Sequence, residues 1–102
     1  MNVIIQSVKF DADKKLVGFI QEKVGKIDRF VEDAIGVEVT LKVDRDNEKG
    51  NKVAAIRVEI PGNDLIAERK AKSFEEAIDL GIDAIKRQQE KRKTVGTNYH
   101  PK

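Results

Sequence analysis

The chain has 102 residues and no cysteine, with 20 Lys and Arg against 18 Asp and Glu, so its formal net charge is +2. This length allows a single hydrophobic core, and the missing cysteine excludes disulfides and thiolate chemistry. Since the N-terminus lacks the basic start and apolar run of a secretion signal, and no segment approaches the roughly 18 apolar residues needed to span a bilayer, we expect a soluble, cytoplasmic protein.

A strand and then a helix are predicted in the first 31 residues. Residues 3–10 mix apolar and polar side chains and are rich in β-branched residues, which is typical of a strand. Asp13 is the predicted N-cap of a helix that reaches Val31. Its apolar face has helical spacing and consists of Leu16, Phe19, Ile20, Val24, Ile27, Phe30 and Val31. The complementary face carries a cationic row, Lys23, Lys26 and Arg29.

Three more strands are predicted between residues 35 and 71. Residues 35–43 alternate, with Val37, Val39, Leu41 and Val43 on the inward side. A polar hairpin loop follows, and residues 52–60 alternate again, with Ala54, Ile56, Val58 and Ile60 on one side. Residues 61–64, Pro-Gly-Asn-Asp, predict a turn in which Gly or Asn takes the left-handed position. Residues 65–71 are rich in charge, which suits an edge strand.

The last predicted element is a helix from Ser73 to Lys93. Ser73 and Glu76 have the spacing of a capping box. An apolar stripe then recurs at helical spacing, formed by Phe74, Ala77, Ile78, Gly81, Ile82 and Ile85. Past Ile85 the core side of the helical wheel holds Gln89 and Arg92. We therefore expect the last two turns to run beyond the sheet into solvent.

This helix closes with a concentrated positive charge. Residues 1–85 hold 14 Lys and Arg against 17 Asp and Glu, whereas residues 86–102 hold 6 against 1. Cations at a helix C-terminus are favoured by the macrodipole, by about 0.3–1 kcal/mol each, so a solvated helix end is one interpretation. The dipole effect fades within one turn and does not require five cations in eight residues, which favours the second interpretation, a contact with a polyanion.

The element order is β-α-β-β-β-α and predicts an α+β two-layer sandwich. A strand-helix-strand unit implies a parallel first pair, and short loops make the other pairs antiparallel. We expect a four-stranded mixed sheet with both helices on one face, side by side, so that their two cationic rows form one surface. Residues 1–93 form the predicted domain and residues 94–102, which lack periodicity, a flexible C-terminal tail.

Three segments carry a family resemblance: VEVTLKVDRDNEKGNKVAAIRVEIPGNDL, FIQEKVGKIDRFV and FEEAIDLGIDAIKRQQEKRK. In order and spacing they resemble the ribosome hibernation-promoting factor family, which includes the ribosome-associated translation inhibitor, over about residues 3–93. The resemblance implies a fold similar to double-stranded RNA-binding domains. It also implies a non-enzymatic factor, made in stationary phase or stress, that binds the small ribosomal subunit and its rRNA, covers the mRNA and tRNA sites and preserves idle ribosomes.

The resemblance also implies which residues bind rRNA phosphates. The family's first-helix pattern, Lys-x-x-Lys-x-x-Arg, falls on Lys23, Lys26 and Arg29. The second-helix pattern, Arg-Gln-x-x-Lys-x-Lys, falls on Arg87, Gln88, Lys91 and Lys93, and the same cationic end adds Lys86 and Arg92. Tyr99 is a candidate for stacking on a base.

The sequence departs from the family at three positions. The family usually has a Lys where Ala84 stands, an apolar residue where Gln89 stands and often an acid where Lys86 stands. Long members carry a second, dimerisation domain; this sequence ends nine residues after Lys93, so we expect no dimerisation domain of its own.

Other chemistry has little support in the sequence. His100 is the only histidine and has no cysteine near it, so we expect no metal, no cofactor and no small-molecule substrate. The glycine-rich and Walker phosphate motifs are missing. One alternative function stays open, a protein-interaction module that uses the exposed sheet face or edge strand and its charged residues Arg57, Glu59, Glu68, Arg69 and Lys70.

Overall fold

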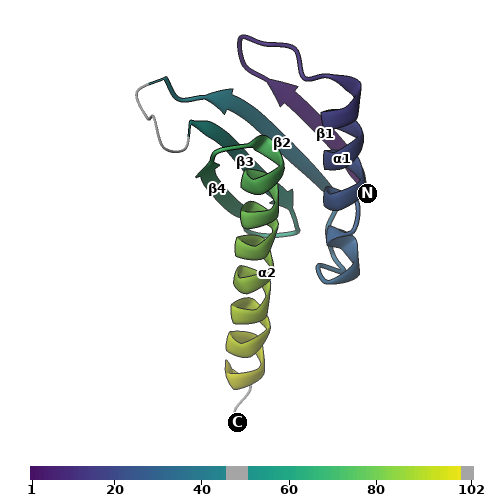
Figure 1. Cartoon of the computed structure of the whole chain (residues 1–102). Helices are drawn as coiled ribbons and strands as arrows, with labels where there is room; N and C mark the ends of the chain where they lie inside the picture. The colour runs from purple at the N-terminus through teal and green to yellow at the C-terminus, as the bar shows by residue number, and fades with distance from the viewer. Residues whose placement is uncertain (46–50, 100–102) are drawn as a thin grey trace.

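The computed structural model describes the backbone of residues 1–45 and 51–99 and the side chains of residues 1–45 and 51–92. Its elements follow the predicted order (Figure 1). They are β1 (Asn2–Ser7), α1 (Lys14–Val24), the 3-10 helix η1 (Ile27–Arg29), β2 (Gly36–Val43), β3 (Lys52–Glu59), β4 (Leu65–Ala71) and α2 (Phe74–Tyr99).

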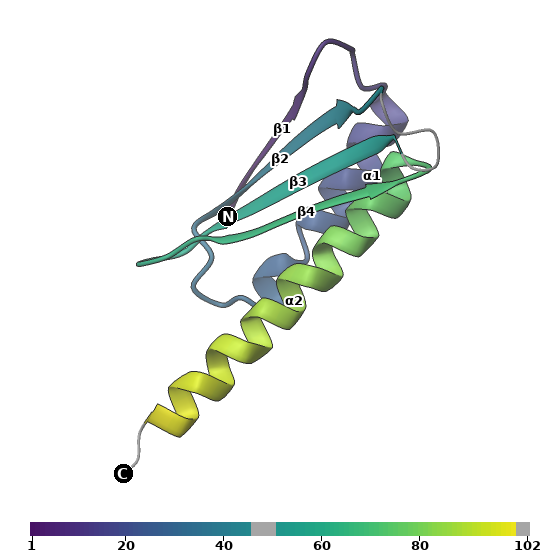
Figure 2. The same ribbon diagram turned by 90° about the vertical axis from the view of Figure 1, so that its left-hand side faces the viewer.

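The four strands form one sheet in the order β1-β2-β3-β4. β1 is parallel to β2, and the two remaining pairs are antiparallel. Both helices cover the same face of this sheet, as the side view shows (Figure 2). The predicted two-layer α+β sandwich is therefore confirmed, while its likeness to double-stranded RNA-binding domains stays a prediction.

The core lies between the sheet and the two helices. Inward side chains of adjacent strands stand in register, so that Val39, Ile56 and Ala67 form one buried row across the sheet. α2 approaches this row closely at Gly81, where an added Cβ would lie 2.8 Å from Cδ1 of Ile56. The glycine in the predicted apolar stripe thus sets how near α2 lies to β3.

The first helix is shorter than predicted. α1 ends at Val24, and Gly25 is its C-cap, with the backbone N–H of Gly25 donating to the carbonyl of Gln21. The chain then turns into η1. Apolar residues at helical spacing continue past Gly25 because η1 also packs onto the core, with Ile27 buried, and this continuity hid the break. Glycine has a low helix propensity, which is why the break falls there.

The predicted caps and turn are largely confirmed. Asp13 accepts a hydrogen bond from the backbone N–H of Leu16 (2.8 Å) at the start of α1. The hydroxyl of Ser73 accepts one from the N–H of Glu76 (3.1 Å), although the return bond of a full capping box is not formed among the described residues. Gly62 has φ +98°, the left-handed conformation expected in the turn between β3 and β4.

One inward residue and one outward residue differ from the prediction. Val43, expected in the core, is 37% exposed, because it lies at the end of β2. Val53 precedes the inward Ala54 on β3 and points to the opposite face, yet it is fully buried between its register neighbours Lys42 and Lys70. The outer face of the sheet is therefore not uniformly wet.

The second helix is longer than predicted and ends at Tyr99 instead of Lys93. Extending an existing helix costs far less than starting one, and the next residue that forbids helix is Pro101.

Gln89 of α2 lies on the core side, as expected, but it is buried, with only 4% of its surface exposed. Its Oε1 finds no hydrogen-bond partner among the described residues.

Replacing Gln89 by Leu should therefore stabilise the protein. A buried acceptor without a partner costs about 1–3 kcal/mol, and leucine fills a similar volume, so we expect the free energy of unfolding in urea to rise by about 1 kcal/mol. Gln88 offers a matched control because its Nε2 donates to the carbonyl of Ile66 (2.7 Å). Gln88→Leu should lower stability, and equal effects of the two substitutions would contradict this assignment.

Candidate nucleic-acid interface

The predicted cations of α2 do not all face the same way. Its C-terminal part runs past the sheet and forms one end of the elongated molecule (Figure 1). The helix leaves the sheet later than predicted, because Gln89 is still buried and Gln88 still contacts β4. Lys86 lies toward the chain after η1, whereas Gln88 is bonded to β4. Arg87 is 79% exposed in its side chain. The cationic end therefore surrounds α2 rather than forming one stripe.

Lys23 and Lys86 share the seam between the two helices. Nζ of Lys23 lies 4.0 Å from a carboxylate oxygen of Asp79 on α2 and 5.6 Å from the ring centre of Phe19. Nζ of Lys86 lies 5.9 Å from the ring centre of Phe30, just after η1. Each cation thus has an aromatic face beneath it, which holds a charge near the surface without neutralising it.

Lys26 and Arg29 are brought to this region by a different element than predicted. Lys26 is the residue before η1 and Arg29 is its last residue, and both are exposed. Arg29 directly precedes Phe30, over which Lys86 lies. Lys86 of α2 therefore lies beside the segment that holds Arg29, but the predicted row on one continuous helix is wrong, because α1 ends at Val24 and Gly25 is its C-cap.

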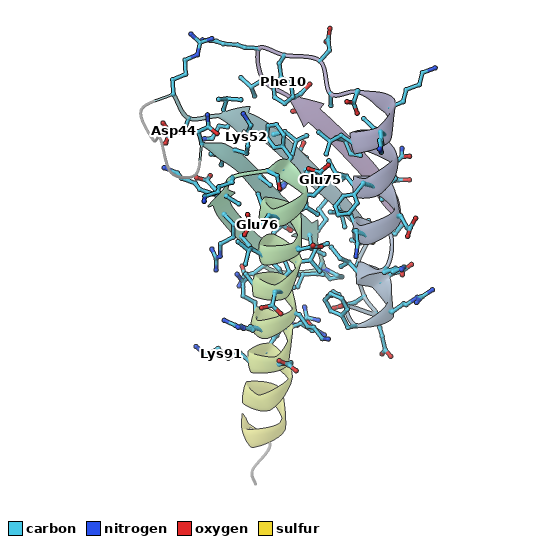
Figure 3. The ribbon with its side chains drawn as sticks, viewed as in Figure 1. Phe10, Asp44, Lys52, Glu75, Glu76 and Lys91 are labelled. Atoms are coloured by element: carbon cyan, nitrogen blue, oxygen red, sulfur yellow. The ribbon has the colours of Figure 1, made fainter. Side chains whose placement is uncertain are left out.

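Lys91 lies on the opposite side of α2. Figure 3 shows it on the side away from α1. With Gln88, Arg92 and the turn after β3 it lines a shallow groove of about 540 Å³. Gln88 and Lys91 therefore do not share a face with Lys23, and the predicted single compact footprint divides into a seam and a groove with exposed Arg87 between them.

Acidic residues accompany several of the cations. Arg92 donates to Asp33, with Nη2 and Oδ1 2.8 Å apart, and ties the far part of α2 to the segment before β2. Arg87 pairs with Asp83 at 3.2 Å, one helical turn earlier. This pair can be predicted from the sequence, because its residues are four apart on one helix. The partners Asp33 and Asp79 come from distant segments and carry no such signal.

The Arg92 contact shifts the acidity of its partner. The hydrogen bond from Arg92 holds the pKa of the Asp33 carboxyl below its ordinary value of 3.8, against a smaller opposing effect of burial. Asp33 therefore stays ionised, and the pair persists, at any pH near neutrality.

The remaining predicted residues lie outside the described side chains. These are Lys93 and Tyr99, whose backbone belongs to α2. His100, to which the sequence assigns no site, also lies outside the described residues. Within the described part of the chain, no group of three or more His, Cys, Asp or Glu side chains is placed to hold a metal ion. The region has the chemistry of a phosphate-binding surface, with cations on exposed helical turns and flanking aromatic rings.

Two solved structures share this fold. A structure from Coxiella burnetii, described as a ribosomal subunit interface protein, superposes with a TM-score of 0.79 at 17% identity, covering 92% of this chain and 99% of the other. The N-terminal domain of Thermus thermophilus Protein Y superposes with a TM-score of 0.74 at 21% identity, covering 89% and 98%. At these identities the likeness defines the class of fold.

The sequence itself defines the family. Residues 3–95 match the family described as sigma 54 modulation protein / S30EA ribosomal protein, and the chain belongs to this family. The ribosome hibernation promotion factor of Deinococcus radiodurans is 33% identical over 78 residues. That match covers 74% of this chain but 40% of the relative, so the chain spans about two fifths of that protein's length.

The Asp33 carboxyl should titrate at an unusually low pH. Because its pKa is lower in the folded than in the unfolded chain, the contact with Arg92 stabilises the fold above the ordinary Asp pKa, and this stabilisation is lost as the pH falls through the folded value. Carboxyl-detected NMR titration should show the low value in the wild type and a return toward 3.8 in Arg92→Gln. An unchanged midpoint in the variant would show that Arg92 is not the cause.

Proposed function

We propose that this protein is a ribosome hibernation factor. It binds the small ribosomal subunit through rRNA phosphates, covers the mRNA and tRNA sites, and so inhibits translation and preserves idle ribosomes in stationary phase or stress. Membership of the S30EA ribosomal protein family and the named function of the Deinococcus radiodurans relative support this proposal. It places the protein in the cytoplasm and assigns it no catalytic step, cofactor or small-molecule substrate.

The observation that carries the proposal is the exposed cationic end of α2. Lys86, Arg87 and Lys91 are exposed over less than two turns of α2. Of these, Lys86 lies over Phe30, next in sequence to the exposed Arg29 of the η1 segment. Lys23, Gln88 and Arg92 complete the described part of the surface, and Lys93 and Tyr99 belong to the same helix. Such an arrangement suits a folded RNA with phosphates on more than one side of an inserted helix.

Binding at this surface must compete with the acids already present. The Lys23–Asp79 and Arg87–Asp83 pairs are solvent-exposed, and exposed pairs contribute about 0–1 kcal/mol, so phosphate displaces them at little cost. Each phosphate that is neutralised releases counterions, so affinity falls steeply with salt. An exposed cationic surface can bind phosphates without a pocket.

No helix in the described part of the chain is long and apolar enough to cross a membrane.

A second candidate function has one observation in its favour. Ile4 and Ile66 are 52% and 59% exposed on the outer sheet face, at either end of a row completed by Glu38 and Arg57. Exposed apolar side chains on a sheet suit a protein partner. Capture of a partner that resists salt and nuclease treatment would favour this interaction module over RNA binding.

Reversing the exposed cations of α2 should abolish ribosome binding. In the triple variant Lys86→Glu, Arg87→Glu and Lys91→Glu, repulsion replaces attraction at three phosphate contacts, so we expect affinity for purified small subunits to fall at least about a hundredfold. Arg92 is left intact because Asp33 holds it. Co-sedimentation through sucrose gradients measures the loss.

A matched control separates local contacts from total charge. Lys14, Arg69 and Lys72 are also two lysines and one arginine, are exposed, and lie outside α2 and the η1 segment. Reversing these three makes the same change in net charge, and we expect it to weaken binding far less. Equal losses in the two triple variants, or co-sedimentation that the α2 variant leaves unaltered, would refute the proposed surface.

A further inference from the structure

A second cationic site lies at the other end of the molecule. A hollow of about 300 Å³ is lined by Val8, Lys9, Phe10, Lys42, Val43 and Arg45. It is built from the connection after β1 and the end of β2, whereas the cationic half of α2 emerges at the opposite end of the long axis (Figures 1 and 2). In Figure 3, Phe10 lies near one end of the molecule and Lys91 on the part of α2 that leads to the other end.

The three cations of the hollow are available to a ligand. Lys9, Lys42 and Arg45 are exposed, and within residues 1–45 and 51–92 no ion pair engages them. Of the acids next to them in the sequence, Asp44 is hydrogen-bonded to Lys70 at 2.7 Å, and Asp11 is exposed. Among the described residues, the hollow therefore combines three cations with two nearby acids, of which Asp44 already binds Lys70.

The hollow is held in shape by short-range bonds. The hydroxyl of Ser7 donates to the carbonyl of Phe10 (2.6 Å), and the N–H of Val8 donates to the carbonyl of Leu41 on β2 (2.9 Å). Between these bonds Lys9 has φ +66°, in the left-handed region that lysine rarely adopts. A non-glycine residue persists there only where its surroundings determine its conformation, and such positions cluster at functional sites.

The floor of the hollow is apolar and partly open. Val8 is 44% exposed and Val43 is 37% exposed, and neither belongs to the core cluster. The ring of Phe10 is stacked on that of Phe74, with centroids 5.2 Å apart and planes at 12°, so the floor is anchored to the start of α2. Cations around an anchored apolar floor match the two parts of a nucleotide, a phosphate and a base.

We propose that this hollow, lined by Lys9, Lys42 and Arg45 around Val8 and Val43, binds a single-stranded RNA segment with one base on the apolar floor. Its volume is at the small end of ligand pockets, roughly 300–1,000 Å³, which suits one nucleotide. The inference rests on the proposed function and adds a second point of contact with rRNA. The domain, 50 × 27 × 18 Å in extent, then holds RNA at both ends of its long axis.

Neutralising the hollow tests its contribution to binding. The triple variant Lys9→Gln, Lys42→Gln and Arg45→Gln is compared with Lys14→Gln, Arg69→Gln and Lys72→Gln, which has the same net charge. Removing three single-strand phosphate contacts should make the slope of log K against log salt shallower by about 2 and weaken binding to small subunits about tenfold. A slope and affinity equal to those of the control variant would overturn the proposal.

Cross-linking locates the contact without removing any cation. Because the chain has no cysteine, Val43→Cys and Glu90→Cys each introduce one site for a photoreactive probe, in the hollow and on α2 respectively. On small subunits, both should give rRNA adducts, at two separate rRNA segments. The RNA-binding role of the hollow would be overturned if Glu90→Cys gave rRNA adducts but Val43→Cys gave none, or only adducts with ribosomal proteins. That result would leave the proposed function intact. Failure of the unlabelled wild type to bind small subunits would overturn both.

Discussion

The packing of α2 across the sheet is the contact on which the rest of the molecule depends. Ile78 and Ile85 of its first half are buried in the core, and Gly81 lets the helix approach Ile56 on β3. Once the first half is held, extending the helix costs little, because each added residue continues an existing hydrogen-bond pattern. The same packing therefore buries the core and projects the cationic turns beyond it.

The cationic surface is organised by weak contacts rather than by strong ones. Aromatic rings lie beneath Lys23 and Lys86, and exposed carboxylates pair with Lys23 and Arg87. Contacts of this kind orient long side chains but are easily exchanged for contacts with a ligand, since exposed pairs contribute little to stability. Arg92 differs, because its hydrogen bond to Asp33 joins segments 59 residues apart. It ties the far part of α2 to the segment before β2.

Much of the fold was predictable because it depends on local patterns. The alternation in residues 35–43 and 52–60 and the apolar stripe from Phe74 to Ile85 each have one period, and each produced the expected element. The misses occur where the apolar period and the element do not end at the same residue. Apolar spacing runs through Gly25 although the helix ends there, and the helix past Lys93 continues without any apolar signal.

By itself the sequence determined the element order, the buried faces and the family, because periodicity, caps and turns act over a few residues. Only the tertiary structure decided which cations meet. It placed Lys86 beside Phe30, turned Gln88 and Lys91 toward the other side of α2, and gathered Lys9, Lys42 and Arg45 around one hollow. These positions depend on the direction in which each side chain leaves its element and on the packing of segments far apart in the chain, which no local spacing encodes.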